Sequence, residues 1–177
     1  MRAVNYLCAF EYDLAERHSN KDVRALAERR GDLLTPIVKG WSTEIGQKLT
    51  SVGVQIHGGM GFIEETGAAQ YLRDSRITTI YEGTTGIQAA DLVGRKTLRD
   101  GGKAIRELIA DMKETLNVMN GDDKTLEIIR DSFAQSVEDL EYVVDWLLAT
   151  ASDPRLAAAA ASSYLHLVGI TCGGWLL

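Results

Sequence analysis

The sequence predicts an all-α protein, a helical bundle, on three observations. Apolar residues recur every three or four positions along several long stretches, as they do on one face of a helix. Only two prolines interrupt the 177 residues, and no segment alternates apolar and polar residues as a half-buried strand would. With 45% hydrophobic and 25% charged residues, the composition is that of a folded soluble domain and not of a disordered chain.

The first helices are delimited by capping residues and glycines. Asn20 can cap a short helix that ends near Arg30-Gly31, and Asp32 can begin the next, long helix. We expect the long helix to run to about His57 and to stop at Gly58-Gly59. Its apolar residues fall on one stripe, which comprises Trp41, Ile45, Leu49, Val52 and Ile56. We interpret Trp41, on this stripe, as a core packing residue.

Shorter helices follow, and then two long amphipathic ones. A short helix is expected around residues 68–75, and another is expected to begin at Thr85, where Thr85 and Gln88 have the spacing of a capping box. Asn120-Gly121 predicts the turn between the two amphipathic helices. Their apolar stripes are Ile105, Leu108, Met112, Leu116 and Met119, then Leu126, Ile129, Phe133, Val137, Leu140, Val144 and Leu147.

Asp153-Pro154 marks the start of the last helix, with proline in the first turn. Residues 156–177 carry almost no charge and are long enough to raise the question of a membrane span. Because this stretch is rich in alanine and contains serines, a histidine and a glycine pair, a buried core helix is favoured over a span. A membrane-associated bundle remains an alternative that rests on this stretch alone.

Charge and cysteine content exclude several functions. The 19 Lys and Arg against 25 Asp and Glu give a net charge of −6, which argues against a nucleic-acid-binding surface. Cys8 and Cys172 lie far apart and form no metal-binding pair, so we expect no zinc site, no disulfide and no other metal site. The two cysteines are interpreted as small apolar core residues in a reducing, cytoplasmic compartment. Residues 1–20 lack the basic start and apolar core of a signal peptide.

The region from His57 to Thr85 departs from the helical pattern. Glycines, aromatic residues and charges interleave there, and loops held by a rigid scaffold commonly carry function. The backbone of Gly58, Gly59 and Gly61 can approach a phosphate closely, although glycines also simply end helices. His57 is interpreted as a ligand or as a capping residue.

Glu82 is the candidate catalytic residue of this region. It precedes the helix expected at Thr85, whose positive end favours an ionised carboxylate. An ionised carboxylate on a glycine-flanked loop can act as a general base, or it can merely complement the helix dipole; the residues alone leave both interpretations open. The nearby charges Arg73, Asp74 and Arg76 are interpreted as a solvated, ion-paired face.

Three strings in this region together resemble the acyl-CoA dehydrogenase family. They are VQIHGGMGF at residues 54–62, YLRDSRI at 71–77 and IYEGTTGIQ at 80–88, in the order and spacing of the family. The resemblance covers residues 1–100 as the C-terminal helical domain of the family. Residues 101–177 resemble the additional helical extension of a branch that includes 3-methylmercaptopropionyl-CoA dehydrogenases.

The resemblance implies a reaction and a role for the Glu82 loop. Enzymes of this family oxidise an acyl-CoA thioester to the 2-enoyl-CoA, with the α-proton taken by a glutamate and the β-hydrogen leaving as hydride to the flavin N5. Glu82 matches that base, and its backbone N–H matches a donor that polarises the thioester carbonyl. Tyr81 and Gly83 match positions at the acyl-CoA pocket.

The resemblance also implies FAD contacts and partners. One segment, commonly reaching the FAD of a neighbouring subunit, comprises Gln55, Ile56, His57, Gly58 and Gly59. A second follows the base and comprises Thr84, Thr85 and Gly86; many relatives carry a longer polar residue where this chain has Gly86, which leaves a backbone contact there. An electron-transfer flavoprotein as acceptor and a homo-oligomer, dimer or tetramer, are implied for the whole enzyme.

The family also predicts what this chain does not contain. Its members are more than twice this length, with a β-domain that holds much of the flavin, so we expect a C-terminal fragment that is inactive alone and ends inside the last helix of the extension. The competing hypothesis is a non-catalytic helical binding or assembly module derived from the family. The intact Glu82, Gly83 and Gly58-Gly59 favour the enzyme.

Overall fold

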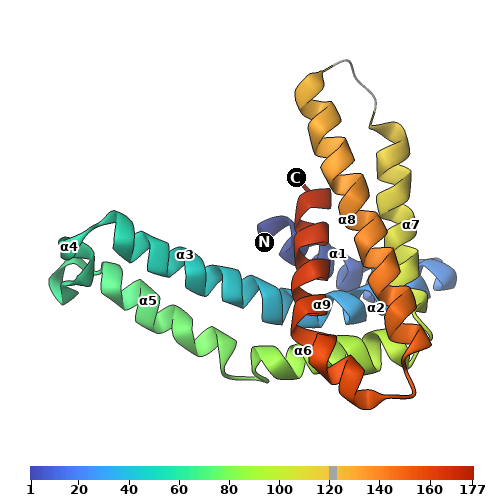
Figure 1. Ribbon diagram of the computed structural model, residues 1–177, viewed down its shortest axis with the longest axis horizontal. Helices are drawn as coiled ribbons and strands as arrows, with labels where there is room; N and C mark the ends of the chain where they lie inside the picture. Colours follow the sequence, from blue (N-terminus) through green and yellow to red (C-terminus); the bar gives the residue numbers. More distant parts are fainter. Residues whose placement is uncertain (120–122) are drawn as a thin grey trace.

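The computed structural model describes residues 1–119 and 123–177, and none of these residues lies in a strand. The all-α prediction is therefore confirmed. Figure 1 shows a body from which two pairs of helices project. The body holds α1 (Arg2–Arg17), α2 (Lys21–Pro36) and α6 (Thr85–Val93), with α9 (Pro154–Trp175) of the extension, residues 101–177, packed into it. One pair is α3 (Ser42–Ile56) with α5 (Ala68–Arg76), joined through α4 (Gly59–Phe62); the other is α7 (Lys103–Val118) with α8 (Lys124–Ala149).

The helix that Asn20 caps is longer than predicted. Asn20 Oδ1 accepts a hydrogen bond from the backbone N–H of Asp22 at 2.7 Å, which confirms the cap. Asp32, however, begins no helix: α2 passes through it and continues as a π-helical segment, η1 (Ile37–Trp41), into α3. Gly31 lies inside α2 and does not end it. Its role is to leave room for α1, because a Cβ at this position would lie 3.2 Å from the ring of Tyr12.

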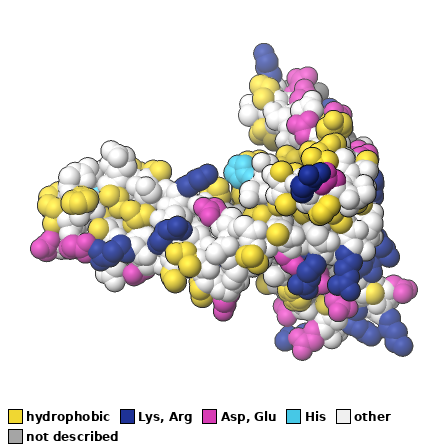
Figure 2. Space-filling model, turned by 60° about the horizontal axis from the view of Figure 1, so that its bottom comes forward, with side chains coloured by type: hydrophobic (Ala, Val, Ile, Leu, Met, Phe, Trp, Pro, Cys, Tyr) yellow, Lys and Arg dark blue, Asp and Glu magenta, His cyan; other side chains and the backbone are white. Residues whose placement is uncertain are grey.

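The arm formed by α3 and α5 leaves the body and exposes most of one predicted stripe. α5 lies beside α3, and Thr50 and Ser75 share a hydrogen bond of 2.9 Å. Trp41 is buried, but Leu49, Val52 and Ile56 are 55%, 52% and 79% exposed. The stripe therefore packs against the body only at its start. Figure 2 shows hydrophobic side chains gathered over the end of this arm.

The extension shares one hydrophobic core with the first hundred residues. Buried side chains from α7, α8 and α9 join those of α1, α2 and α6, among them Ile105, Met112, Leu140 and Val168. α7 and α8 run antiparallel, with ion pairs Arg106–Asp145 at 2.5 Å and Lys113–Glu141 at 2.7 Å between them. The turn predicted at Asn120-Gly121 lies outside the described residues.

α9 begins as predicted, with Asp153 Oδ1 accepting from the backbone N–H of Arg155 at 3.0 Å. By length and composition α9 is apolar enough to cross a membrane, with 39% of its most apolar window buried inside the protein. This is weak evidence for a span, because a core helix passes the same test. One face of α9 does pack into the core: Tyr164, Leu165, Val168 and Cys172 are at most 2% exposed.

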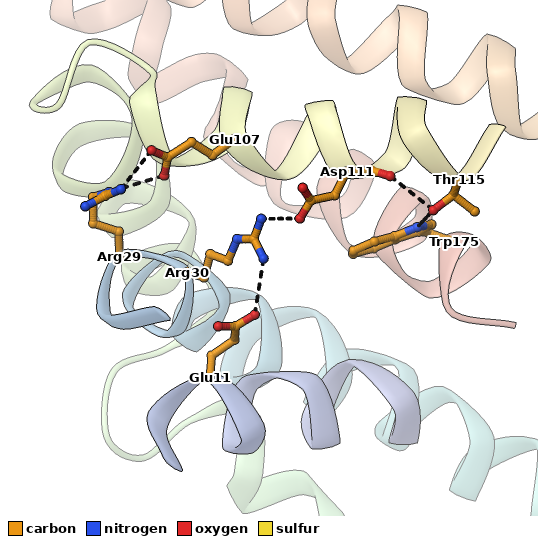
Figure 3. A network of polar contacts seen from close by, with 7 residues as sticks. All are labelled: Glu11, Arg29, Arg30, Glu107, Asp111, Thr115 and Trp175. Carbon is orange, nitrogen blue, oxygen red and sulfur yellow. Dashed lines mark hydrogen bonds and ion pairs between the residues drawn. The ribbon is translucent and has the colours of Figure 1, made fainter. Parts of the chain in front are cut away.

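A polar joint ties the extension to the body (Figure 3). The guanidinium of Arg30 on α2 lies between Glu11 of α1, 3.6 Å away, and Asp111 of α7, with which it forms a hydrogen-bonded ion pair. Beside it, Arg29 pairs with Glu107 of α7 through two hydrogen bonds of 2.8 and 3.2 Å. Four of these five charged residues thus join α2 directly to the extension.

Candidate active site

Glu82 lies on the loop between η3 (Ile77–Thr79) and α6, in an unusual backbone conformation. Its φ is +53°, and among the described residues no other non-glycine residue has a positive φ. Gly83 follows with a φ of +90°. A non-glycine residue in this region costs conformational energy and persists only when its surroundings hold it, which is common at functional sites. The loop thus presents the Glu82 side chain in a fixed direction towards solvent.

Two side chains hold this loop from neighbouring elements. Gln88 of α6 reaches back, and its Nε2 donates to the backbone carbonyl of Glu82 at 3.2 Å. Lys39 of η1 donates from Nζ to the carbonyl of Thr78 at 2.9 Å and lies 5.7 Å from the centre of the Tyr81 ring. The loop is therefore fixed on both sides of Glu82.

The capping box predicted for Thr85 and Gln88 is not formed. α6 begins at Thr85 as predicted, but Thr84 is its N-cap residue. Thr85 Oγ1 instead donates to Glu44 Oε1 of α3 at 2.6 Å, and Gln88 bonds to the carbonyl of Glu82. Thr85 and Gln88 therefore bond to Glu44 and to the Glu82 carbonyl, and not to the backbone N–H groups that a capping box would use.

The carboxylate of Glu82 is exposed and unpaired within the described part of the chain: it makes no ion pair and accepts no hydrogen bond there. An unpaired carboxylate at the positive end of a helix is available to accept a proton. This is the property that a general base requires.

The start of α6 offers free backbone donors beside Glu82. The side chain of Thr84 makes no capping hydrogen bond, and the first intrahelical bond runs from Gln88 N to Thr84 O at 3.0 Å. A Cβ at Gly86 would have only the Thr84 hydroxyl within 4 Å. The N–H groups of the first turn have no acceptor within the helix, and Thr84 and Gly86 are exposed, which suits an anionic group such as a phosphate.

The second predicted cofactor segment lies elsewhere, at the far end of α3. Eleven residues separate Gln55 from Glu44, which contacts Thr85, so the two segments are about 16 Å apart along the helix. His57 is the C-cap residue of α3, and its Nδ1 shares a hydrogen bond of 2.8 Å with Gly53 O. Gly58 has a φ of +60°, and Gly58 and Gly59 face open space. The structure thus brings Tyr81–Gly86 together but not Gln55–Gly59 with them.

The charged face before the loop is exposed, but of its three residues only Arg73 makes an ion pair within the described chain. Arg73 pairs with Glu64, and Asp74 accepts from Gln70 at 3.4 Å. Arg76 donates to the hydroxyl of Thr79, which helps to shape the turn into the Glu82 loop. Among the residues described, no cluster of three or more His, Cys, Asp or Glu side chains is arranged to hold a metal ion.

A hollow of about 430 Å³ opens beside Thr85, and its far wall comes from the extension. Sequence patterns did not single out this hollow, because its lining side chains come from four separate elements, η1, α3, α6 and α9. They include Trp41, Glu44, Lys48, Thr85, Ser162 and His166. The extension therefore reaches the neighbourhood of the candidate base.

Helices α2 to α6 and the Glu82 loop lie within a stretch that matches a known helical domain. The family description "Acyl-CoA dehydrogenase, C-terminal domain" matches residues 7–97, and the chain belongs to the acyl-CoA dehydrogenase family. A second family description, "Acetyl-CoA dehydrogenase C-terminal like", matches residues 105–177 of the extension.

Similar proteins include two bacterial dehydrogenases. The 3-methylmercaptopropionyl-CoA dehydrogenase of Ruegeria pomeroyi is 46% identical over 166 residues, which are 93% of this chain and 28% of that protein. The broad-specificity linear acyl-CoA dehydrogenase FadE5 of Mycobacterium tuberculosis is 31% identical over 159 residues, 86% of this chain and 26% of that protein. The chain thus spans less than a third of the length of these relatives.

A solved structure, described as the Bd2924 apo-form, has the same fold. It superimposes with a TM-score of 0.71 at 20% identity, covering 99% of this chain and 31% of that one. The arrangement of body, arm and extension therefore recurs in a distant protein.

Proposed function

We propose that this chain is the C-terminal part of an FAD-dependent acyl-CoA dehydrogenase that oxidises an acyl-CoA thioester to the 2-enoyl-CoA. The observation that carries the proposal is the Glu82 loop: a strained, glycine-flanked residue whose carboxylate is unpaired within the described chain. The family of the chain gives this loop its chemical meaning.

In the proposed mechanism Glu82 removes the α-proton of the thioester. Because the α-C–H is a weak acid, the negative charge that develops on the thioester oxygen must be stabilised as the proton leaves. The backbone N–H of Glu82 supplies a hydrogen bond to that oxygen in this proposal, and Tyr81 and Gly83 line the acyl-CoA. When bound, FAD supplies the hydride acceptor for the β-hydrogen.

The two glycine-containing segments are proposed to contact FAD. The free N–H groups of Thr85 and Gly86 fit an anionic part of the cofactor, and Thr84 lies beside them. Gln55–Gly59 lies too far along α3 to contact the same end of the cofactor within one chain. Following the resemblance to the family, we assign this segment to the FAD of a neighbouring subunit, which requires at least a dimer.

The exposed arm supports the proposal of assembly. Leu49, Val52, Ile56 and Phe62 form apolar surface at the end of α3 that a soluble protein normally covers. We propose that the remaining domains and a second subunit of a cytoplasmic homo-oligomer, dimer or tetramer, cover it. An electron-transfer flavoprotein is the proposed electron acceptor, and residues 101–177 are proposed as packing or assembly surface.

The test is anaerobic mixing of the full-length enzyme that contains this chain with a panel of acyl-CoAs, including a short thioether acyl-CoA. Loss of flavin absorbance is followed in the wild type and in Glu82→Gln. Bleaching in the wild type and its near-complete loss in the variant support the proposal. Equal bleaching in both would place the base elsewhere. If no thioester bleaches the flavin, the non-catalytic module becomes the better account.

A further inference from the structure

Resting on the proposed function, we infer that Gln88 is a positioning residue for catalysis: its amide holds the backbone of Glu82 in the conformation from which the carboxylate can reach the substrate. The inference starts from the backbone. Glu82 has a φ of +53°, in a region that favours glycine, so another contact must offset its conformational cost.

The contact that meets this need comes from Gln88. Its Nε2 donates to the carbonyl of Glu82 at 3.2 Å, across six residues of sequence. That carbonyl belongs to the peptide between Glu82 and Gly83, so the bond fixes the orientation of this peptide. Because the same residue's φ and ψ link this peptide to the side chain of Glu82, fixing one restricts the other.

Gln88 is close-packed against the loop. A Cβ on Gly83, whose φ is +90°, would lie 2.9 Å from Gln88 Nε2. Glycine at 83 therefore both adopts the required conformation and leaves room for the amide to reach the Glu82 carbonyl. Both the positive φ at position 83 and the closeness of the Gln88 amide therefore favour glycine there.

The other end of the Gln88 side chain is anchored in the core. A Cβ at Gly40 would lie 3.2 Å from Gln88 Cβ and 2.7 Å from Leu165 Cδ2 of α9. Gln88 and Leu165 thus crowd the same point of η1, and the adjacent Ala89 is fully buried. The base of the half-buried Gln88 side chain therefore lies where α9 of the extension also packs on η1.

The donor character of the amide gives a specific test. The Gln88→Glu variant places a carboxylate against the Glu82 carbonyl; ionised, it repels that oxygen, whereas protonated, it can donate as the amide does. Gln88→Met keeps the length and removes the donor at every pH. The rate constant of flavin reduction is measured by stopped flow in the full-length enzyme from about pH 5.5 to 8.5.

We expect Gln88→Glu to reduce flavin more than about tenfold more slowly than wild type across this range, because a glutamate with its usual pKa of about 4.3 is ionised throughout and its carboxylate repels the Glu82 carbonyl where the amide made a bond worth about 1.4 kcal/mol. Gln88→Met should be slower by about tenfold with a ratio that does not change with pH. Bound flavin and acyl-CoA affinity should remain those of the wild type in both. Gln135→Glu, on the exposed part of α8, is the matched charge control and should match the wild type throughout.

The inference is overturned if Gln88→Met reduces flavin at the wild-type rate, or if Gln88→Glu is no slower than Gln88→Met. Should Gln88→Glu fail to bind flavin, the Gln88→Met rate alone decides. A wild-type rate in Glu82→Gln in the same assay would instead overturn the proposed function, so the two failures are distinguishable.

Discussion

At the scale of single residues, Trp41 shows how closely the extension is fitted to the family domain. It is only 7% exposed, and its indole lies against α9 where two glycines leave room for it. A Cβ on Gly169 would lie 2.2 Å from Trp41 Cγ, and one on Gly173 would lie 3.0 Å from Trp41 Cη2. The packing of α9 on η1 thus depends on the absence of side chains at these positions.

We expect Gly169→Ala to lower the free energy of unfolding by about 3 kcal/mol, because the added methyl forces Trp41 or α9 to move in a close-packed core. Urea unfolding followed by tryptophan fluorescence measures the change. Gly174→Ala is the control: its added methyl would have no atom within 4 Å, so the midpoint should not fall. Equal stability of Gly169→Ala and wild type would contradict this packing.

Residue patterns predicted local structure better than they predicted partners. The caps at Asn20 and Asp153 and the stop at Gly58-Gly59 follow from local chemistry and are confirmed. The helix boundary predicted at Gly31-Asp32 is wrong, because the need for space beside Tyr12 is a tertiary contact that the sequence does not display. Thr85 and Gln88 have tertiary partners for the same reason.

At the scale of helices, the joint between α1, α2 and α7 centres on Arg30. Its side chain is 18% exposed, and it faces the carboxylates of Glu11 and Asp111. Removing a largely buried cation that faces two acids leaves both carboxylates without a counter-charge, which costs more than the loss of an exposed pair. The strength of the joint therefore depends on Arg30 more than on its neighbour Arg29.

We expect Arg30→Met to lower the free energy of unfolding at pH 7 by about 3 kcal/mol. Arg29→Met, which breaks the more exposed pair with Glu107, should cost about 1 kcal/mol or less. Chemical denaturation of both variants under the same conditions provides the comparison. Similar losses in the two variants would show that Arg30 is not the centre of the joint.

The same joint predicts a dependence of stability on pH. Burial raises the pKa of Glu11 above its usual value, the nearby Arg30 offsetting this only in part, and burial likewise raises the pKa of Asp111. A carboxyl that binds its proton more tightly when folded stabilises the protein at low pH. That contribution is lost as the pH rises from the unfolded pKa, about 4.3 for Glu, through the raised folded value.

Glu11→Gln removes this titration while keeping an acceptor for Arg30. We expect the variant to be at least as stable as wild type at pH 7 and its stability to fall less between about pH 4.5 and 7. Unfolding midpoints across that range measure both effects. Glu16→Gln, at an exposed site on the same helix, should keep the wild-type slope. A Glu11→Gln slope identical to wild type would contradict the raised pKa.

At the scale of the whole molecule, the arm and the body have different roles. The body and extension share one core, whereas the arm carries the glycine-rich segment away from it and exposes apolar side chains such as Ile56 and Phe62 (Figures 1 and 2). Helical periodicity predicted α3 but could not show that most of its stripe is exposed. Periodicity reports which residues share a face, and only the tertiary arrangement shows what that face meets.

The 177-residue chain on its own should not retain FAD. It spans less than a third of the length of its relatives and offers only an open helix end and a separate glycine segment to hold the cofactor. We expect the purified chain to show no bound-flavin absorbance after FAD is added and the excess removed. Stoichiometric flavin in the isolated chain would contradict the two-segment account.

The local motifs located the candidate site but not its support. Tyr81, Glu82, Gly83 and the start of α6 could be found because they are contiguous in sequence. Glu44, Lys39 and Gln88 could not be assigned their present contacts, because two of them reach the loop from another helix and the third bonds back across six residues. Positioning contacts of this kind become visible only in three dimensions.

The measurement that tests the central claim most directly is proton removal itself. The full-length enzyme is incubated in D₂O with an acyl-CoA whose β-position carries no hydrogen, so that the reaction stops after loss of the α-proton. Deuterium at the α-carbon is then followed by mass spectrometry. We expect exchange with wild type and almost none with Glu82→Gln. Equal exchange in both proteins would contradict the assignment of Glu82 as the base.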